Sequence, residues 1–298
     1  MTAATGLADA RAPRTLRVGP RGASLAVEVA GAGPPILLLH GFTGSTRTLD
    51  GVGGGLRAAG YRTIAVDALG HGASDAPPAA AAYRLERAAA GLVDVLDALC
   101  VPRAAVFGYS MGGRTALGLA VLHPARVRAL VVVGASAGLA DPAARAARRR
   151  ADEALAAAIL RDGVPAFVER WMANPLFATQ ARLGPAALAA ARAQRLANRA
   201  DGLALSLRGL GTGAQPPLHA ELRGLEAPLL AIAGEEDAKF RALAAELAAL
   251  APRGRAAVIA GAGHAAHLEA PAATLREVCR FLASLPVDDS NRHSRGTP

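Results

Sequence analysis

The chain has 298 residues, of which 52% are hydrophobic and 19% are charged, so it is long and apolar enough to bury a large core. Its formal net charge of +9 comes almost entirely from arginine, and aromatic residues make up only 3%. Nucleic-acid sites combine basic with aromatic side chains, so this composition argues against nucleic-acid binding.

The cysteines and the hydropathy pattern bear on the compartment. Cys100 and Cys279 have no paired spacing, which indicates neither a disulfide framework nor a zinc site. The N-terminal stretch lacks the apolar segment of a signal peptide, and no later stretch reaches about 18 uninterrupted apolar residues. We therefore expect a cytoplasmic protein that does not bind membranes, and the sequence leaves its oligomeric state open.

Short apolar runs alternate with longer amphipathic segments along the chain. This alternation predicts an α/β fold with a mostly parallel central sheet flanked by helices. The predicted strands are 25–29, 36–39, 63–66, 104–107, 129–133, 229–233 and 256–259. The predicted helices include 84–99, 112–122 and 274–285.

The strand pattern disappears between residues 140 and 217, where Ala, Leu and Arg recur at helical spacing. Helix breaks are expected at Gly163, Pro165, Pro175, Gly184 and Pro185. We interpret 140–217 as a helical cap over a pocket. Residues 15–139 and 218–285 would form the core, with flexible ends at 1–14 and 286–298.

Two loops after predicted strands carry histidines. "LLLHGFTGS" follows the strand at 36–39 and is typical of a loop that donates a backbone N–H to an oxyanion, here from Phe42. His40 would shape this loop by hydrogen bonding. In "DALGHGASD", the loop after 63–66, His71 is interpreted as structural.

The segment "GYSMG" places Ser110 between a predicted strand and a predicted helix. This context makes a G-x-S-x-G motif informative, because the tight turn strains the serine backbone and projects its hydroxyl above the sheet. Side chains at Gly108 or Gly112 would collide with neighbouring backbone. The Met111 N–H, at the start of the helix, would be the second oxyanion donor.

A serine hydroxyl needs a base, and an acid and a histidine follow in the expected order. "AIAGEEDAKF" places Glu235, Glu236 and Asp237 after one strand, and "IAGAGHAAHLEAP" places His264 and His267 after the last. We predict that Ser110, Asp237 and His264 form a catalytic triad. His264 directly follows the strand and a flexible turn, whereas His267 is interpreted as a packing or substrate-lining residue.

Several strings carry a family resemblance. HGF, DALGHGAS, GYSMGG and GAGH resemble the α/β-hydrolase superfamily. "GYSMGGRTAL", "ERWMANPLFATQ", "SLRGLGTGAQPPL", "GEEDAKF" and "GHAAHLEAP" resemble, more narrowly, the 2-succinyl-6-hydroxy-2,4-cyclohexadiene-1-carboxylate synthases of menaquinone biosynthesis. The chain departs from that family at His219, where tryptophan is common, and in "GVGGGL", which is poor in helix formers.

This resemblance implies a lyase that eliminates pyruvate from a substrate with several carboxylates. The Ser110–His264 couple would then abstract a proton instead of attacking a carbonyl. Arg114 would meet a substrate carboxylate, and Trp171 and Arg195 would lie near the substrate in the cap. One of Arg148, Arg149 and Arg150 would bind another carboxylate; Arg148 is our candidate, and the choice among the three stays open.

Apart from the resemblance, the position of one residue, Arg114, favours a carboxylate substrate. Arg114 lies one helical turn beyond the nucleophile, where it helps to bind a carboxylate but not a neutral ester, unless it is simply a surface arginine. No nucleotide-binding fingerprint or metal-ligand cluster occurs, so we expect no cofactor and no metal. The alternatives are a serine hydrolase of esters or C–C bonds, and a non-catalytic binding protein, which would be expected to lack part of the triad.

Overall fold

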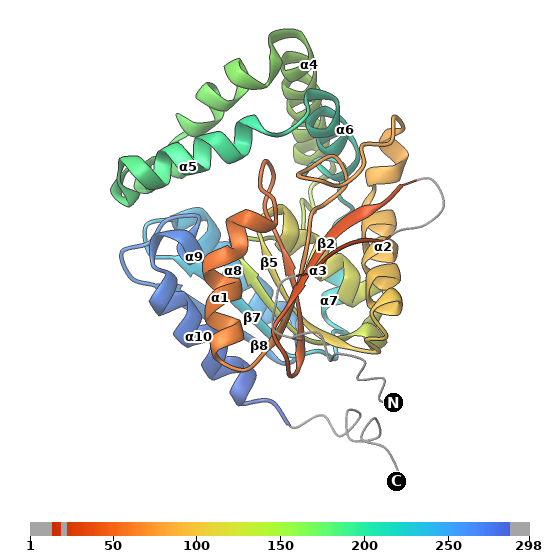
Figure 1. Ribbon diagram of the computed structural model, residues 1–298, viewed down its shortest axis with the longest axis vertical. Coiled ribbons are helices and arrows are strands. Elements are labelled where there is room, and N and C mark those ends of the chain that lie inside the picture. The colour runs from red at the N-terminus through yellow and green to blue at the C-terminus, as the bar shows by residue number, and fades with distance from the viewer. Residues whose placement is uncertain (1–13, 19–22, 287–298) are drawn as a thin grey trace, which may run out of the picture.

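The computed structural model describes residues 14–18 and 23–286. It confirms the predicted α/β fold, with one central sheet, helices on both faces, and a group of helices lying above the sheet (Figure 1). The ends predicted to be flexible lie almost entirely outside the described residues.

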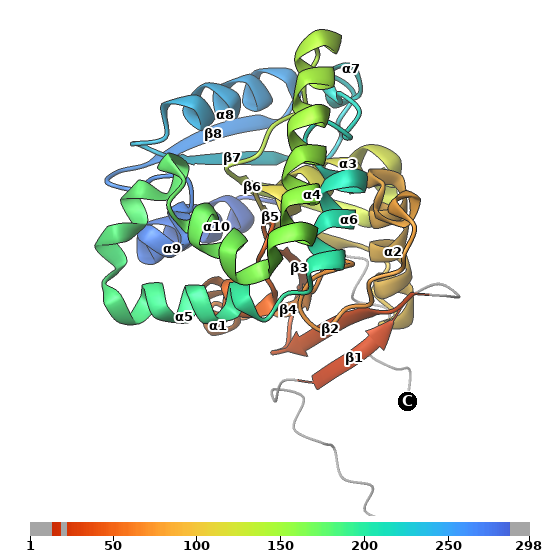
Figure 2. The same ribbon diagram turned by 90° about the horizontal axis from the view of Figure 1, so that it is seen from above.

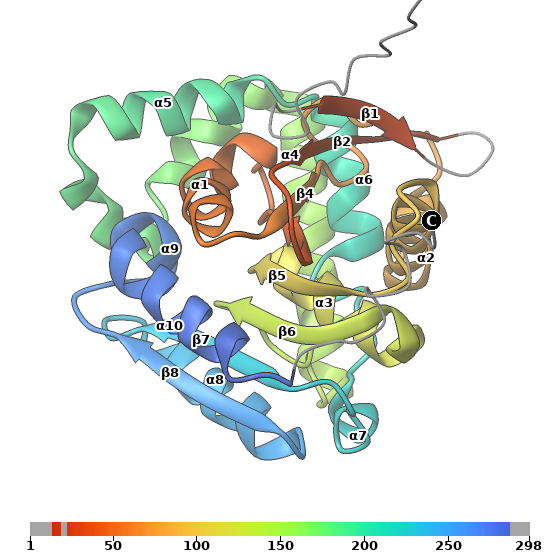
Figure 3. The ribbon, with the colours of Figure 1, turned by 60° about the horizontal axis from the view of Figure 1, so that its bottom comes forward.

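The sheet has eight strands in the described part of the chain, in the order β1-β2-β4-β3-β5-β6-β7-β8. Figure 3 follows it from β1 at one edge to β8 at the other. The strands from β4 to β8 along this order pair in parallel, whereas β2 pairs antiparallel with both β1 and β4. Their bounds are β1 Arg14–Val18, β2 Leu25–Ala30, β3 Pro35–Leu39, β4 Arg62–Val66, β5 Ala104–Tyr109, β6 Val127–Val133, β7 Leu229–Gly234 and β8 Gly254–Ile259.

All seven predicted strands occur, each within two residues of its predicted bounds. The parallel strands at the centre are buried on both faces and therefore read as continuous apolar runs. Strand β1 was missed, because its sequence "RTLRV" mixes arginine with only two large apolar residues. It begins at Arg14, the last residue of the predicted flexible N-terminus.

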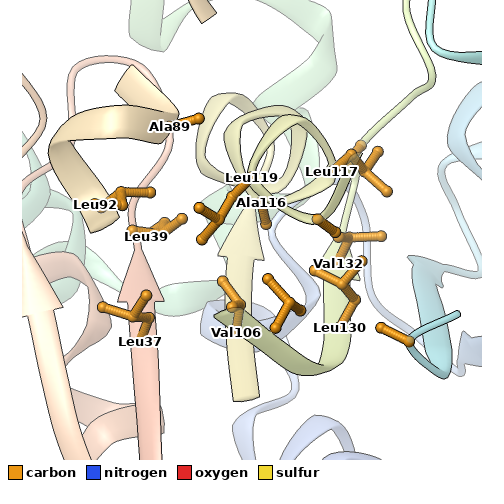
Figure 4. Packing of buried hydrophobic residues seen from close by; sticks show 14 of the residues in the cluster. Leu37, Leu39, Ala89, Leu92, Val106, Ala116, Leu117, Leu119, Leu130 and Val132 are labelled. Atoms are coloured by element: carbon orange, nitrogen blue, oxygen red, sulfur yellow. The ribbon is translucent and has the colours of Figure 1, made fainter. Parts of the chain in front are cut away.

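Helices cover the two faces of the sheet. Buried residues of α2 (Leu85–Ala98), α3 (Met111–Leu122) and α8 (Ala238–Leu250) belong to one core cluster, and those of α1 (Asp50–Ala58) and α10 (Pro271–Ala283) belong to another. Figure 4 shows the first cluster, in which Leu37, Val106 and Val132 of the strands meet Leu92 of α2 and Leu119 of α3. The shorter helices are η1 Thr46–Leu49, η2 Ala80–Tyr83, η3 Pro124–Arg126, α7 His219–Leu222 and α9 Ala266–Glu269.

Residues 140–217 contain no strand, and their helices lie above the sheet (Figures 1 and 2). These are α4 (Pro142–Met172), η4 (Pro175–Leu183), α5 (Pro185–Leu196) and α6 (Ala200–Leu210). Gly163 interrupts α4 with φ 79°, Gly184 has φ 82°, and Pro175 and Pro185 are the first residues of their helices. Ile159 and Phe167 of α4 pack on Leu203 of α6, so the segment has a small core of its own.

Three further findings concern the described residues. Within them, no helix is long and apolar enough to cross a membrane. No group of three or more His, Cys, Asp or Glu side chains is placed to hold a metal ion in that part of the chain. Both cysteines are free, and Cys100 lies in the turn after α2.

Candidate active site

Ser110 lies in the turn between β5 and α3, with φ 51° and ψ −108°. This is the strained, left-handed backbone expected of a nucleophile elbow, and the Ser110 N–H holds it by donating to Val133 O at 2.8 Å. A Cβ on Gly108 would lie 2.4 Å from Gly112 O, and one on Gly112 would lie 2.2 Å from Leu39 O. Both glycines are therefore required by backbone packing, as predicted.

The structure brings Ser110, Asp237 and His264 together from three separate loops. His264 Nδ1 lies 2.9 Å from Asp237 Oδ2, and His264 Nε2 lies 3.3 Å from Ser110 Oγ. A carboxylate only accepts, so Nδ1 carries the proton and Nε2 is free to accept one from the serine hydroxyl. Asp237 and His264 are buried, which strengthens this contact by excluding water.

The two other acidic residues of "GEEDAKF" have different partners. Glu235 Oε2 accepts from the Gly261 N–H at 2.9 Å, and Glu236 forms an exposed ion pair with Arg182 at 2.8 Å. Asp237 also accepts from the Phe240 N–H at 3.1 Å, so it caps α8 while its second oxygen holds His264. Of the three, only Asp237 is placed to orient the imidazole.

Aromatic rings surround His264. Its ring centroid lies 4.4 Å from that of Phe240, 5.4 Å from that of Tyr109 and 6.1 Å from that of Phe177. Phe177 belongs to η4, so the helices above the sheet contribute directly to the surroundings of the histidine. These rings were not predicted from the sequence. The only local signal was the position of Tyr109 and Phe240 next to the predicted triad residues.

The two predicted oxyanion donors are the N–H groups of Phe42 and Met111. Met111 is the first residue of α3, and its N–H has no partner within the helix. Among the described residues, neither N–H donates a hydrogen bond to another protein group. Both are therefore available to an oxygen atom of a substrate.

His40 and His71 lie beside the Phe42 loop and are buried. The Ala68 N–H donates to His40 Nε2 at 3.0 Å, so His40 Nδ1 must carry the proton, which it donates to Gly41 O at 2.8 Å. Burial lowers the pKa of His71 to about 3. Both side chains are therefore neutral and hold the loops together, in line with the structural roles predicted for them.

Arg114 is buried and is not a surface arginine. Its Nη1 donates to Leu210 O and to Gln215 Oε1, both at 2.9 Å. Burial, and then the nearby charge of Arg148, lowers the pKa of Arg114 to about 10, so it remains protonated at neutral pH. A guanidinium has five N–H donors, so donors remain after these two contacts. Gln215 was not singled out from the sequence.

The three consecutive arginines of α4 have different surroundings. Arg148 Nε forms an ion pair with the buried carboxylate of Asp152 at 2.7 Å. The positive charge of Arg148 also helps to lower the pKa of Arg114. Arg149 donates to Gly213 O and lines a surface groove of about 600 Å³ together with Arg84, Arg145 and Arg208. None of the triad residues lines this groove. Of these three arginines, Arg148 is the one whose charge helps to lower the pKa of Arg114.

Trp171 and Arg195 come from the helices above the sheet. The Trp171 ring lies 5.4 Å from Phe42 and 5.5 Å from Phe177, so it connects the oxyanion loop with the ring beside His264. Arg195 is buried and lies near Tyr109, and burial lowers its pKa. Trp171 Nε1 and Arg195 Nε are both buried without a hydrogen-bond partner among the described residues. Such donors are costly to leave unpaired.

His267 packs against Tyr109, with ring centroids 4.4 Å apart, and neither of its ring nitrogens has a hydrogen-bond partner among the described residues. Burial lowers its pKa to about 3 from an ordinary value of 6.5. The unfolded chain therefore binds a proton between these two pH values that the folded chain excludes. The contribution of His267 to folding stability is therefore fully present above about pH 6.5 and is lost as the pH falls toward 3.

We expect His267→Gln to reduce this loss of stability in acid. Between pH 7 and pH 5 the free energy of unfolding of the variant should fall by about 2 kcal/mol less than that of the unsubstituted protein. Urea titrations at the two pH values measure this difference, and titrations at pH 7 and 8 are the control, because His267 is then mostly neutral in both states. Equal losses in the two proteins between pH 7 and 5 would contradict the prediction.

Comparison with known proteins places the chain in a family. The family model described as "alpha/beta hydrolase fold" matches residues 34–271, which include the elbow, the acid and the histidine. The chain belongs to the α/β-hydrolase fold family. This membership agrees with the order of Ser110, Asp237 and His264 along the sequence.

Relatives within this hydrolase-fold family extend over most of the chain. A putative 2-succinyl-6-hydroxy-2,4-cyclohexadiene-1-carboxylate synthase of Bacillus subtilis (strain 168) is 38% identical over 88% of this chain and 95% of its own length. The synthase of that name from Salmonella agona (strain SL483) is 35% identical over 84% of this chain and 94% of its own. The solved structure of MenH from S. aureus has a TM-score of 0.82 at 30% identity, covering 86% of this chain and 97% of that one.

Proposed function

We propose that this protein is a 2-succinyl-6-hydroxy-2,4-cyclohexadiene-1-carboxylate synthase of menaquinone biosynthesis, and that it acts as a lyase that eliminates pyruvate. The synthases of Bacillus subtilis and Salmonella agona, 38% and 35% identical to this chain, support the proposal. Within the site, the proposal is supported by two buried arginines, Arg114 of α3 and Arg195 of α5. Arg114 follows Ser110 by one helical turn, and Arg195 lies near Tyr109, beside the nucleophile.

In this proposal Ser110 acts as a base. His264 Nε2 accepts the hydroxyl proton, and the serine oxygen removes a proton from the substrate carbon next to a ketone. The electrons of that C–H bond move onto the ketone oxygen, and the N–H groups of Phe42 and Met111 stabilise the resulting enolate. The enolate then collapses to a new C=C bond, and the C–O bond to the enolpyruvyl group breaks. The leaving enolpyruvate oxygen takes a proton back from the Ser110–His264 couple, which restores both side chains, and the enol tautomerises to pyruvate. No acyl-enzyme is required.

The arginines provide binding and orientation. Arg114 and Arg148 would bind one carboxylate of the substrate, while Arg195 Nε and Trp171 Nε1 would donate to another group. Fixing the substrate at two ends holds its acidic C–H close to the serine oxygen. The partner is therefore a small carboxylate molecule. On the basis of the composition, we propose that the protein acts in the cytoplasm. No part of the proposed mechanism uses a cofactor.

The assay that tests the proposal measures two reactions of one preparation. We expect rapid pyruvate release from the enolpyruvyl-bearing cyclohexene precursor, followed with lactate dehydrogenase and NADH, and only slow hydrolysis of p-nitrophenyl acetate. Ser110→Ala protein supplies the background rate for both reactions. Efficient ester hydrolysis without pyruvate release would replace this proposal with the alternative, a serine hydrolase.

A further inference from the structure

The loop that carries the Phe42 N–H contains a strained residue. Thr43 has φ 68°, in the left-handed region that a β-branched side chain adopts only when its surroundings impose it. The Gly44 N–H closes this turn by donating to Gly41 O at 2.9 Å. Thr43 is buried. The contacts that hold this residue therefore determine the shape of the loop.

Two side chains from the helices above the sheet hold the Thr43 carbonyl. Gln194, in α5, donates its Nε2 to Thr43 O at 3.0 Å, and Asn198, just beyond α5, donates its Nδ2 at 2.9 Å. Asn198 is buried and also donates to Arg195 O at 3.0 Å, which fixes the direction of its amide. Both amides thus donate to the same carbonyl, and both come from the C-terminal end of α5.

Peptide geometry connects these contacts with the oxyanion site. Thr43 O and the Gly44 N–H belong to one peptide unit, and Gly41 O and the Phe42 N–H belong to another. In a trans peptide the C=O and N–H bonds point in opposite directions, and the described residues contain no cis peptide. The Gly44 N–H binds Gly41 O, so a rotation of the first peptide unit releases the second. The Phe42 N–H, which shares a peptide unit with Gly41 O, would then change direction.

We propose that Gln194 and Asn198 are positioning residues that hold the Phe42 N–H in its donor position, so that the oxyanion site is complete only while the end of α5 rests on the Thr43 loop. The inference depends on the proposed function in one respect, that the Phe42 N–H stabilises an oxyanion. His40 Nδ1, which also donates to Gly41 O, holds the same peptide unit from the core side. The loop is thereby fixed jointly by the core and by α5.

The test removes the amides and keeps their volume. In Gln194→Met/Asn198→Leu protein we expect kcat for pyruvate release to fall by about 10- to 100-fold, part of the effect of losing one oxyanion donor, while KM changes by less than about threefold. Arg192→Ala is the matched control, because Arg192 lies on α5 and pairs with Glu169 without contacting Thr43. The single variants should show smaller losses, and thermal melts identify any variant that fails to fold.

A rescue variant separates positioning from a general contribution to stability. Adding Thr43→Gly to the double variant should restore most of the lost kcat, because glycine adopts a positive φ without steric cost. Amide hydrogen exchange gives an independent readout, and the peptide containing Phe42 and Gly44 should exchange faster in the double variant than in Arg192→Ala. Unchanged kcat and exchange, a rise of KM alone, or no rescue by Thr43→Gly would overturn the proposal.

Ester hydrolysis by the same variants tests the positioning role separately from the proposed function. If the unsubstituted protein releases no pyruvate but hydrolyses p-nitrophenyl acetate, the function is wrong, and the same variants are compared on the ester. Ester hydrolysis also places an oxyanion against the Phe42 and Met111 N–H groups. We then expect the same fall in kcat, the same rescue and the same change in hydrogen exchange, and their absence would overturn the positioning role.

Discussion

Replacing Ser110 with alanine, or His264 with alanine, should lower kcat by at least about a thousandfold. This corresponds to a loss of roughly 4 kcal/mol of transition-state stabilisation. Neither side chain can support catalysis without the other. The hydroxyl is too weak a base or nucleophile without His264 Nε2, which lies 3.3 Å from it, and the histidine alone cannot reach the substrate as the serine oxygen does. Steady-state kinetics on the preferred substrate measure the effect.

A control and the double variant make this result specific. Ser284→Ala removes a hydroxyl that only donates to Phe281 O at the end of α10, and it should retain full activity. Ser110→Ala/His264→Ala should be hardly slower than either single variant, because the two side chains act as one unit. Near-normal turnover in either single variant with an unchanged melting temperature would remove the triad from the mechanism.

Replacing Arg114 with alanine should lower kcat/KM for the carboxylate substrate by about 30- to 1000-fold, which corresponds to 2–4 kcal/mol. The buried guanidinium keeps its charge and has donors beyond those given to Leu210 O and Gln215 Oε1. The substrate carboxylate would lose a charge-assisted contact, and these two acceptors would lose their donor. The kcat/KM of Arg114→Lys should lie between those of the unsubstituted protein and of Arg114→Ala, because lysine keeps the charge without the planar fork of donors.

A second substrate separates these two consequences of losing Arg114. Disturbed packing around Gln215 would lower all activities together, whereas loss of a carboxylate contact would leave any weak hydrolysis of p-nitrophenyl acetate almost unchanged. Arg87→Ala, on the exposed side of α2, is the control for loss of an arginine from the surface. Equal losses with the carboxylate substrate and with the neutral ester would show that Arg114 supports the fold and not the substrate.

Features that depend on neighbours along the chain could be predicted from the amino-acid sequence. Strand β5, the elbow at Ser110 and helix α3 follow from an apolar run, a glycine pair and a helical pattern that are continuous in sequence. The breaks at Gly163, Gly184 and Pro185 are local for the same reason, since left-handed backbone favours glycine and the first turn of a helix accepts proline. The order of serine, acid and histidine could likewise be read directly from the chain.

Contacts between side chains that lie far apart in the sequence could not be predicted and became visible only in the folded chain. Arg114 and Gln215 are 101 residues apart, and Thr43 and Asn198 are 155 residues apart, so no local pattern could pair them. The separate partners of Glu235 and Glu236, and the effect of Arg148 on the pKa of Arg114, depend on the direction in which each side chain leaves its turn or helix. Sequence specifies the kinds of groups available for the chemistry, but distance and direction between them arise only when the helices above the sheet pack against the loops that carry the triad.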